Sequence, residues 1–317
     1  MSSLLPIEEE TEVPFKSKNP GVMHAYGHDG HTAYMLILAD CLIQLKELIS
    51  GTIKIIHQHA EETPPGGAKS IVESGVLDDL DAVFGTHLMP NLPTGIIGYR
   101  SGFSMAGRTY FKLAIKGKGG HGSSPHQAND PIVAGAYFVT AIQTIISCRL
   151  NPFEMGVVTI GSFDGKGAFN VIKDSVELEG DVRYMTEDSQ KIIAEEIHRI
   201  TSGIELEFNV HCELTYVPDY PPLYNDPTVT AKVVSILEQA NDPVIHEITE
   251  IPINSGSEDF SYYTQKIPGT FYIIGCQPKG VVKPYLNHHP KFDIDEEALL
   301  VSAKSVAHVV CDYYDNE

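Results

Sequence analysis

The feature that most constrains the fold of this chain is a change in its hydrophobic pattern near Gly107. Before that point, apolar residues form a helical stripe over 32–49, followed by a β-branched segment at 52–59, a short helix at 68–74 and a strand at 81–86. This alternation of helix and strand is typical of an α/β sheet.

From Gly107 onward, the predicted elements follow the order β-α-β-β-α-β. Asp130 followed by Pro131 is a favourable start for the first helix of this run. The order is that of the split-βαβ, or ferredoxin-like, arrangement, and about 110 residues is a suitable length for one inserted domain. The predicted strands are 109–116, 156–163, 175–184 and 204–215, and the predicted helices are 131–148 and 187–201.

The α/β pattern resumes after a proline-rich bend at 218–222. Helices are predicted at 227–240, 257–265 and 296–313, with an apolar strand at 271–275. The simplest interpretation is one α/β domain interrupted by a ferredoxin-like insert. The predicted boundaries are residues 1–104 and 217–317 for the α/β domain and 105–216 for the insert.

The charge of the chain narrows the class of its partners. Its 317 residues include 22 basic and 42 acidic side chains, which gives a formal net charge of −20. Nucleic acids and anionic membranes both favour a basic surface, so neither is expected as a partner. No apolar run is expected to reach the length of a membrane span, and the acidic first dozen residues are unlike a signal peptide.

The five cysteines are scattered and form no CxxC pair. An odd number without a spacing pattern indicates ordinary thiols in a reducing compartment, not a disulfide framework or a thiolate zinc site. We therefore expect a cytoplasmic globular protein.

Histidines are dense near the start of the chain, where six of the fourteen lie between residues 24 and 87. In the run His24-Ala-Tyr-Gly-His28-Asp29-Gly-His31, glycines flank His28 and Asp29 is a possible orienting carboxylate. A polar helix-entry loop capped by Asp29 or Thr32 explains the same run.

Glu61 and Glu62 follow the predicted strand at 52–59, and His87 follows the strand at 81–86. In open α/β sheets, sites gather beyond the carboxyl ends of strands. One carboxylate would bind a cation and the other would act as general base on a water molecule. An exposed acidic turn and an ordinary polar histidine are the alternatives.

A further pair, His288-His289, lies in the loop before the last helix, although paired histidines in loops are often without function. Taken together, the clusters place His, Glu and His groups at successive loop ends of one sheet domain. This arrangement fits a metal site with nitrogen and oxygen ligands and no thiolate.

The insert contributes His121, Asn170 and Arg183. His121 lies in a glycine-rich segment at 116–126 that lacks the GK[ST] ending of a phosphate loop, so its glycines more plausibly hold His121 forward from the surface. Arg183 suits bidentate binding of a substrate carboxylate, and a solvated strand charge is the alternative. The sequence contains no GxSxG, GxGxxG or HExxH motif, which argues against other catalytic classes.

These motifs occur in a recognisable order: LPIEEET, PGVMHAYGHDGHT, AEE, GTH, KGKGGHGSSPH, FNVI, GSEDFSYY and HHPKFDID. From about Leu5 to Tyr313, the chain resembles the aminoacylase and hippurate-hydrolase family of metal-dependent amidohydrolases, which includes auxin-conjugate (IAA-amino acid) hydrolases and carboxypeptidase relatives. The resemblance implies a zinc-peptidase-like α/β catalytic domain with an inserted ferredoxin-like dimerisation domain. It also implies hydrolysis of the amide bond of N-acyl amino acids.

The resemblance further implies a role for each matching residue. Glu61 matches the general base, and His121 matches a residue that reaches the partner's active site to stabilise the oxyanion. Asn170 and Arg183 match substrate-binding positions, and residues 105–216 would form the homodimer. The matching metal ligands are His28, Glu62, His87 and His288, which would hold one or two divalent ions of zinc, manganese, cobalt or nickel.

Three departures from the family pattern bear on activity. Tyr26 occupies the position of a cysteine ligand, and a phenol is a weaker ligand than a thiolate and projects further. Ser3 stands where the family has an aspartate that supports the metal centre. The family also has a helix and strands before this point, so we expect a shortened relative with an uncovered sheet edge, or a true start upstream of Met1.

Two hypotheses follow. The leading one is an enzyme that hydrolyses N-acyl amino acids. The alternative is a catalytically impaired or inactive dimeric relative that binds an N-acyl amino acid or a related ligand, and Tyr26 and Ser3 motivate it.

Overall fold

The computed structural model describes residues 5–314, so the predicted departure at Ser3 lies outside the described residues. The chain forms two compact units. Unit 1 comprises the residues up to Ser104, Leu223–Ile253 and the residues from Asp259 onward, and unit 2 comprises Met105–Pro222 and Asn254–Glu258. The sequence predicted divisions after residues 104 and 216. In the structure the chain divides after Ser104 and after Pro222, and a short segment returns to unit 2.

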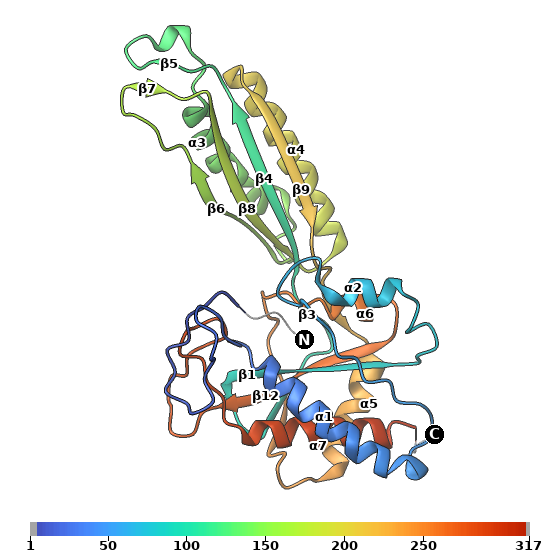
Figure 1. Ribbon diagram of the computed structural model, residues 1–317. Coiled ribbons are helices and arrows are strands. Elements are labelled where there is room, and N and C mark those ends of the chain that lie inside the picture. Colours follow the sequence, from blue (N-terminus) through green and yellow to red (C-terminus); the bar gives the residue numbers. More distant parts are fainter. Residues whose placement is uncertain (1–4, 315–317) are drawn as a thin grey trace. The chain divides into compact units, whose positions relative to one another are not determined.

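Unit 1 is built on a four-stranded mixed sheet in the order β1-β12-β2-β11, of which β1 and β12 are labelled in Figure 1. Strand β12 runs parallel to β1 and antiparallel to β2, and β2 runs parallel to β11. The apolar strand β12 is buried along almost its whole length, as expected for a central strand covered on both faces. The strands are β1 Val83–Pro93, β2 Ile96–Tyr99, β11 Glu247–Glu250 and β12 Gly269–Gln277, with a two-stranded ribbon of β3 Gly102–Met105 and β10 Leu223–Asn225.

Helices pack on this sheet through one apolar cluster. Leu88, Ile97 and Ile274 of the sheet lie against Val233 of α5 and Val301 of α7, and all five side chains are buried. The helices of unit 1 are α1 His28–Gln44, α2 Gly66–Glu73, α5 Pro227–Ala240, α6 Ser261–Thr264 and α7 Glu297–Asp312.

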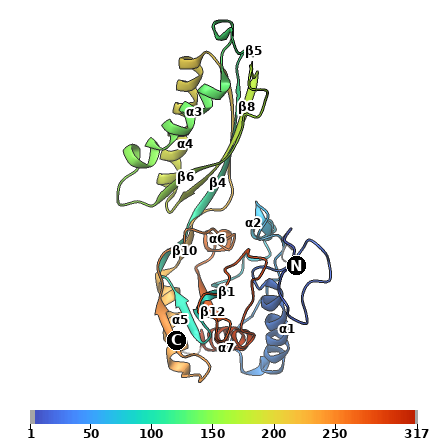
Figure 2. The same cartoon turned by 90° about the vertical axis from the view of Figure 1, so that its left-hand side faces the viewer.

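Unit 2 is an antiparallel sheet in the order β6-β8-β4-β9, with α3 and α4 on one face (Figure 2). Along β4, buried and partly exposed residues alternate, because successive side chains point to opposite faces of the sheet. Order and connectivity are those of the ferredoxin-like fold, as predicted. The elements are β4 Gly107–Lys116, α3 Pro131–Ile142, β6 Gly156–Asp164, β8 Ser175–Tyr184, α4 Glu187–Phe208 and β9 His211–Pro218, with a small ribbon of β5 Gly120–His121 and β7 Val171–Ile172.

The strand predicted at 52–59 is wrong. This segment has no regular secondary structure, and it pairs with no strand of the described chain. A β-branched pattern makes a strand only where a neighbouring strand supplies ladder hydrogen bonds. The prediction that Glu61 and Glu62 follow a sheet strand is therefore also wrong.

The strand predicted at 204–215 is wrong over its first half. Helix α4 continues to Phe208 and ends at Asn209, whose φ of 50° is left-handed. Ile204 alternates with polar residues in the way that a strand would, but it also continues the helical stripe of Ile193 and Ile197 into the core. The segment remains helical because Ile204 then packs in the core on the same face of α4 as Ile193 and Ile197.

Several predicted boundaries shift. Strand β1 extends beyond its predicted end at residue 86 to Pro93, so His87 lies within the strand, opposite Ile273 of β12. Helix α1 begins at His28, four residues before its predicted start. The helix predicted at 257–265 is limited to the single turn of α6.

One helical segment of the described residues, Pro131–Arg149, is long and apolar enough to cross a membrane by length and composition, with 19 residues. The expectation that no apolar run reaches this length is therefore wrong. The same segment buries Ala134, Phe138, Ile142 and Ile145 in the core of unit 2, which a core helix of a globular domain also does.

Candidate metal centre

His28 is placed by the first turn of α1. Gly27 precedes the helix with a left-handed φ of 77°, and a Cβ atom at Gly27 would lie 3.0 Å from Leu88. A side chain at this position would therefore be strained and crowded. The glycine allows the chain to turn closely against β1 and leaves the His28 side chain buried at the start of the helix.

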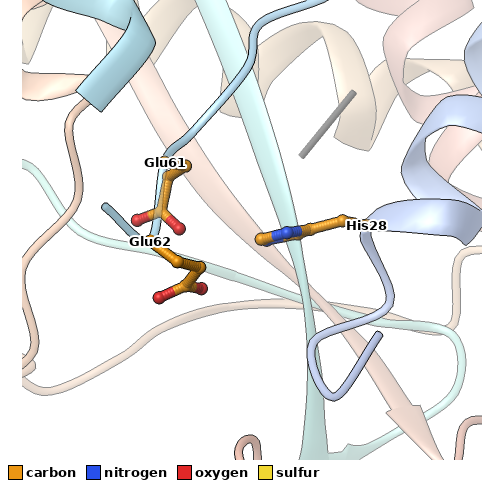
Figure 3. A group of neighbouring side chains, drawn as sticks. All are labelled: His28, Glu61 and Glu62. Atoms are coloured by element: carbon orange, nitrogen blue, oxygen red, sulfur yellow. The ribbon is translucent and has the colours of Figure 1, made fainter. Parts of the chain in front are cut away.

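Glu61 and Glu62 lie in a turn between the segment at 52–59 and α2. The carboxylates face the His28 imidazole (Figure 3), and one ligand atom from each of the three residues lies within 4.8 Å of the others. Ala60, directly before this pair, has a left-handed φ of 56°. Non-glycine residues adopt this conformation at a cost of about 1–3 kcal/mol, and such strain clusters at functional sites.

His87 and His31 extend the cluster. The ring centroid of His87 lies 5.5 Å from that of His28 and 4.9 Å from that of His31. His87 Nδ1 lies 2.8 Å from the Leu88 carbonyl oxygen, to which it donates. This bond leaves His87 Nε2 unprotonated, the form in which an imidazole binds a metal ion.

No role was predicted for His31, although its spacing of three residues from His28 on one helix could have indicated that the two share a face. His31 Nε2 accepts a hydrogen bond of 3.1 Å from the Leu88 amide, so this nitrogen is already used. His31 therefore supports strand β1 next to His87. Asp29, predicted as a possible orienting group, is exposed and accepts instead from the amide of Gly30.

His288 reaches the cluster from the loop before α7. Its backbone has a left-handed φ of 73°, and its amide donates to the Ala25 carbonyl at 2.9 Å. Its ring lies 4.0 Å, centroid to centroid, from the ring of Tyr26 in an edge-on arrangement. The adjacent His289 stacks on Tyr285 and accepts from the Lys291 amide, so only the first histidine of the pair faces this cluster.

The histidines of the cluster are held neutral. Burial, reinforced by the neighbouring His87, His24 and His288, lowers the pKa of His28 to about 3. Burial also lowers the pKa values of His31, His87 and His288. Neutral imidazoles can donate a lone pair to a cation without first losing a proton.

Tyr26 fills the space between two of these rings. It is buried, and its ring stacks on His28 at 5.1 Å between centroids. Burial and the negative charge of Glu62 raise the pKa of Tyr26 far above its usual value. An interaction between the hydroxyl and the Glu62 side chain also favours the protonated form. The Tyr26 side chain is therefore a neutral phenol at neutral pH.

The donor set fits a divalent cation. Imidazoles and carboxylates are ligands that zinc and manganese both accept. In the described part of the chain, the buried Nδ1 atoms of His28 and His24 have no hydrogen-bond partner. A buried polar atom without a partner requires an explanation, and a bound cation nearby provides one.

The three residues predicted in the insert all lie in unit 2. His121 lies in β5 opposite Val171 of β7, and Asn170 directly precedes β7, where its carbonyl accepts from the Gly122 amide at 2.8 Å. Arg183 lies near the end of β8. Its Nε donates to Asp181 at 2.7 Å and its Nη1 to Ser257 at 3.1 Å. The alternative interpretation, a solvated strand charge, does not describe Arg183, because two partners hold its guanidinium.

The fold and the histidine–carboxylate cluster define the class of metal-dependent hydrolases that act on amide bonds. The chain belongs to Peptidase family M20/M25/M40, whose family model matches residues 4–312. This membership agrees with the resemblance found in the sequence.

Relatives of known sequence cover nearly the whole chain. YhaA of Bacillus subtilis, provisionally named an amidohydrolase, is 41% identical over 310 residues, which are 98% of this chain and 78% of YhaA. N-acetyl-L-cysteine deacetylase of the same bacterium is 36% identical over 93% of this chain and 69% of its own. IAA-amino acid hydrolase ILR1-like 4 of Arabidopsis thaliana is 36% identical over 98% and 70%.

Two solved structures share the fold closely. A protein of methicillin resistant Staphylococcus aureus, provisionally described as an aminohydrolase, has a TM-score of 0.91 and 53% identity over 98% of this chain and 79% of its own. Bacillus subtilis YXEP, described as a dinuclear metal binding peptidase of the M20 family, has a TM-score of 0.82 and 32% identity over 99% and 80%.

Proposed function

We propose that this protein hydrolyses the amide bond of N-acyl amino acids at a divalent metal centre held by His28, Glu62, His87 and His288. The observation that carries the proposal is the convergence of a neutral, buried His28 with two adjacent carboxylates within 4.8 Å. One or two ions of zinc, manganese, cobalt or nickel suit these ligands. When bound, the metal would polarise the substrate carbonyl and favour ionisation of the attacking water.

Glu61 is the proposed general base. Its carboxylate lies beside that of Glu62 and faces the same imidazole (Figure 3). Glu61 would accept a proton from the attacking water and deliver it to the departing nitrogen, while Glu62 holds the metal. The two carboxylates thus divide proton transfer from metal binding.

Unit 2 would supply the groups that recognise the substrate. Arg183 presents a guanidinium that can bind the carboxylate of the amino-acid part, and Asn170 offers an amide. We assign His121 of the partner subunit the stabilisation of negative charge on the carbonyl oxygen. This role requires a homodimer formed through residues 105–216, in a cytoplasmic protein whose partners are small molecules and not nucleic acid or membrane.

The relatives support this substrate class. One is named as a deacetylase of N-acetyl-L-cysteine, and another as a hydrolase of IAA-amino acids. Both names describe an acyl group joined to an amino acid. Which acyl group and which amino acid this protein prefers depend on side chains that line the substrate pocket.

The test is substitution of Glu61→Gln in protein loaded with zinc or manganese. With a panel of N-acetyl amino acids, kcat should fall by about 10²–10⁴-fold while metal affinity changes little, because the proton acceptor is lost and the proposed ligands remain. Glu73→Gln, an exposed change of the same charge on α2, is the control and should leave kcat unchanged. An unchanged rate in Glu61→Gln would contradict the assignment of Glu61.

The alternative is a relative that binds an N-acyl amino acid without turnover, and the packing of Tyr26 against His28 and His288 favours it. The substitution Tyr26→Cys separates the two. A large gain in metal affinity and turnover would indicate an enzyme whose site is remodelled. Tight ligand binding with no gain in turnover would favour the binder.

A further inference from the structure

Asp259 is a fully buried carboxylate whose partners lie on both sides of the Glu61–Glu62 turn. Before the turn, Nε2 of Gln58 donates to both of its oxygens, at 2.6 and 2.7 Å. After the turn, the amide of Ala68 in α2 donates to Oδ2 at 3.0 Å. One side chain, nearly 200 residues away in sequence, therefore connects the two ends of the turn.

The Gln58 amide is fixed at its other end as well. The hydroxyl of Tyr263 donates to Gln58 Oε1 at 2.7 Å. Asp259 and Tyr263 belong to the same short stretch around α6, so a single element holds both the NH₂ group and the oxygen of Gln58. The orientation of this amide is therefore determined, and Gln58 lies only three residues before Glu61.

Two glycines allow α2 to approach this carboxylate. A Cβ atom at Gly66 would lie 2.2 Å from Asp259 Oδ2, and a Cβ atom at Gly67 would lie 2.1 Å from the His59 carbonyl oxygen. Neither position accepts any side chain without displacement of the backbone or of Asp259. The close contact between the start of α2, Asp259 and the segment before the turn is thus built into the sequence.

We propose that Asp259 is a positioning residue that holds the Glu61–Glu62 turn in the conformation that directs both carboxylates toward His28. The proposal rests on the proposed function for the roles of Glu61 and Glu62. Asp259 acts through the backbone of the turn, because both of its oxygens already accept N–H groups. A carboxylate oxygen of Asp259 also lies within 4.8 Å of one of Glu61, and the N–H groups offset the repulsion between these charges.

Exchanging the carboxylate of Asp259 and the amide of Gln58 between their two positions tests this role. In Asp259→Asn, one oxygen becomes an NH₂ group that faces the NH₂ group of Gln58. In Gln58→Glu, two carboxylates face each other. In the double variant, the new Asn donates to the new Glu and its oxygen still accepts from Ala68, while Tyr263 still donates to position 58. The hydrogen bonds that join position 259 to position 58 and to Ala68, and position 58 to Tyr263, are then formed again.

Two measurements are made on the full chain: calorimetric titration with zinc, and hydrogen exchange of peptides covering residues 58–68. Each single variant should bind zinc about 10–100-fold more weakly than the wild-type protein, and its turn should exchange faster. The double variant should recover to within roughly threefold in zinc affinity, since the coupling between the two sites restores the pair. Asp242→Asn, which removes another hydrogen-bonded carboxylate of unit 1, should change neither measurement.

Other outcomes overturn the proposal. If the single variants retain wild-type zinc affinity and exchange, Asp259 does not hold the turn. If zinc affinity is lost and the double variant does not recover it, Asp259 is itself a ligand. Where Asp259→Asn fails to fold, Gln58→Ala replaces it and should show the same weakened binding and faster exchange.

A different result would show that the proposed function is wrong. A wild-type protein that binds no zinc and hydrolyses no N-acetyl amino acid would overturn that function. In that case, hydrogen exchange of residues 58–68 still tests whether Asp259 holds the turn. Faster exchange in Asp259→Asn than in the wild type would support this role, and unchanged exchange would refute it.

Discussion

Asp242, in the loop after α5, is a carboxylate with three donors, and its side chain is 9% exposed. It accepts from the Val244 amide at 3.1 Å, from Lys304 Nζ at 3.0 Å and from His308 Nε2 at 3.1 Å. Burial alone would raise the pKa of Asp242, but the hydrogen bonds from His308, Val244 and Lys304 outweigh it and lower the pKa to about 2. The ionised form is therefore the one that stabilises the loop.

This pKa predicts a pH dependence of stability. A carboxyl with a lowered pKa contributes stability above its unfolded value, near 4, and the contribution is lost as pH falls toward 2. Asp242→Asn should lower the free energy of unfolding by roughly 1–2 kcal/mol at pH 7, and the difference from wild type should shrink below pH 4. Urea unfolding at several pH values measures this, and a difference that stayed constant down to pH 2 would contradict it.

At the residue scale, the motifs predicted which residues lie near one another, but not how their backbones are oriented. His28, Glu61, Glu62, His87 and His288 were all selected from motifs, and the structure brings their residues into one cluster, although their roles remain predictions. The left-handed backbones of Ala60 and His288 could not be predicted, because only a few per cent of residues other than glycine have a positive φ. These backbones are fixed by contacts distant in sequence.

Asp259 shows a second limit at this scale. Its partners Gln58 and Ala68 are nearly 200 residues away, and no local spacing links them. A short-range pattern reveals helix faces and strand faces only, so a hydrogen-bonded pair of this kind becomes visible only once the fold is known.

At the scale of elements, the end of α4 gives a test of the corrected boundary. In a strand, Ile204 and Leu206 would share one face, whereas in the helix Ile204 is buried at 4% exposure and Leu206 is 86% exposed. Ile204→Ala should lower the free energy of unfolding by about 2–4 kcal/mol, and Leu206→Lys should change it by less than about 0.5 kcal/mol. Chemical denaturation of both variants is the measurement, and equal losses would favour the strand.

Elements with a strong period were predicted well and those that depend on partners were not. The helix opened by Asp226 and Pro227, for example, begins as predicted because its cap is local: Asp226 accepts from the amides of Thr228 and Val229. The segment at 52–59 failed because pairing is a property of two segments. Its own β-branched residues contain no information about whether a neighbour is present.

At the scale of the whole molecule, the two units have separate apolar cores, one around Leu178 and Phe111 and the other around Ile274 and Tyr272. Separate cores predict two unfolding transitions that can be shifted independently. Leu178→Ala should destabilise one unit and Ile274→Ala the other, each by about 2–5 kcal/mol of unfolding free energy, so each variant should lower the melting temperature of one transition only. Scanning calorimetry of the full chain measures both, and a single transition shifted by either variant would contradict the prediction.

The pairing of β1 with β12 has a consequence for synthesis on the ribosome. Val83 lies opposite Gly269, so the first strand of this sheet is made long before its parallel neighbour exists, whereas every strand of unit 2 is made in between. At about 5–20 residues per second, β1 waits on the order of ten seconds or more with an unsatisfied edge. The nascent chain is therefore expected to fold its middle first, and chaperones that shield exposed strands would act on its beginning.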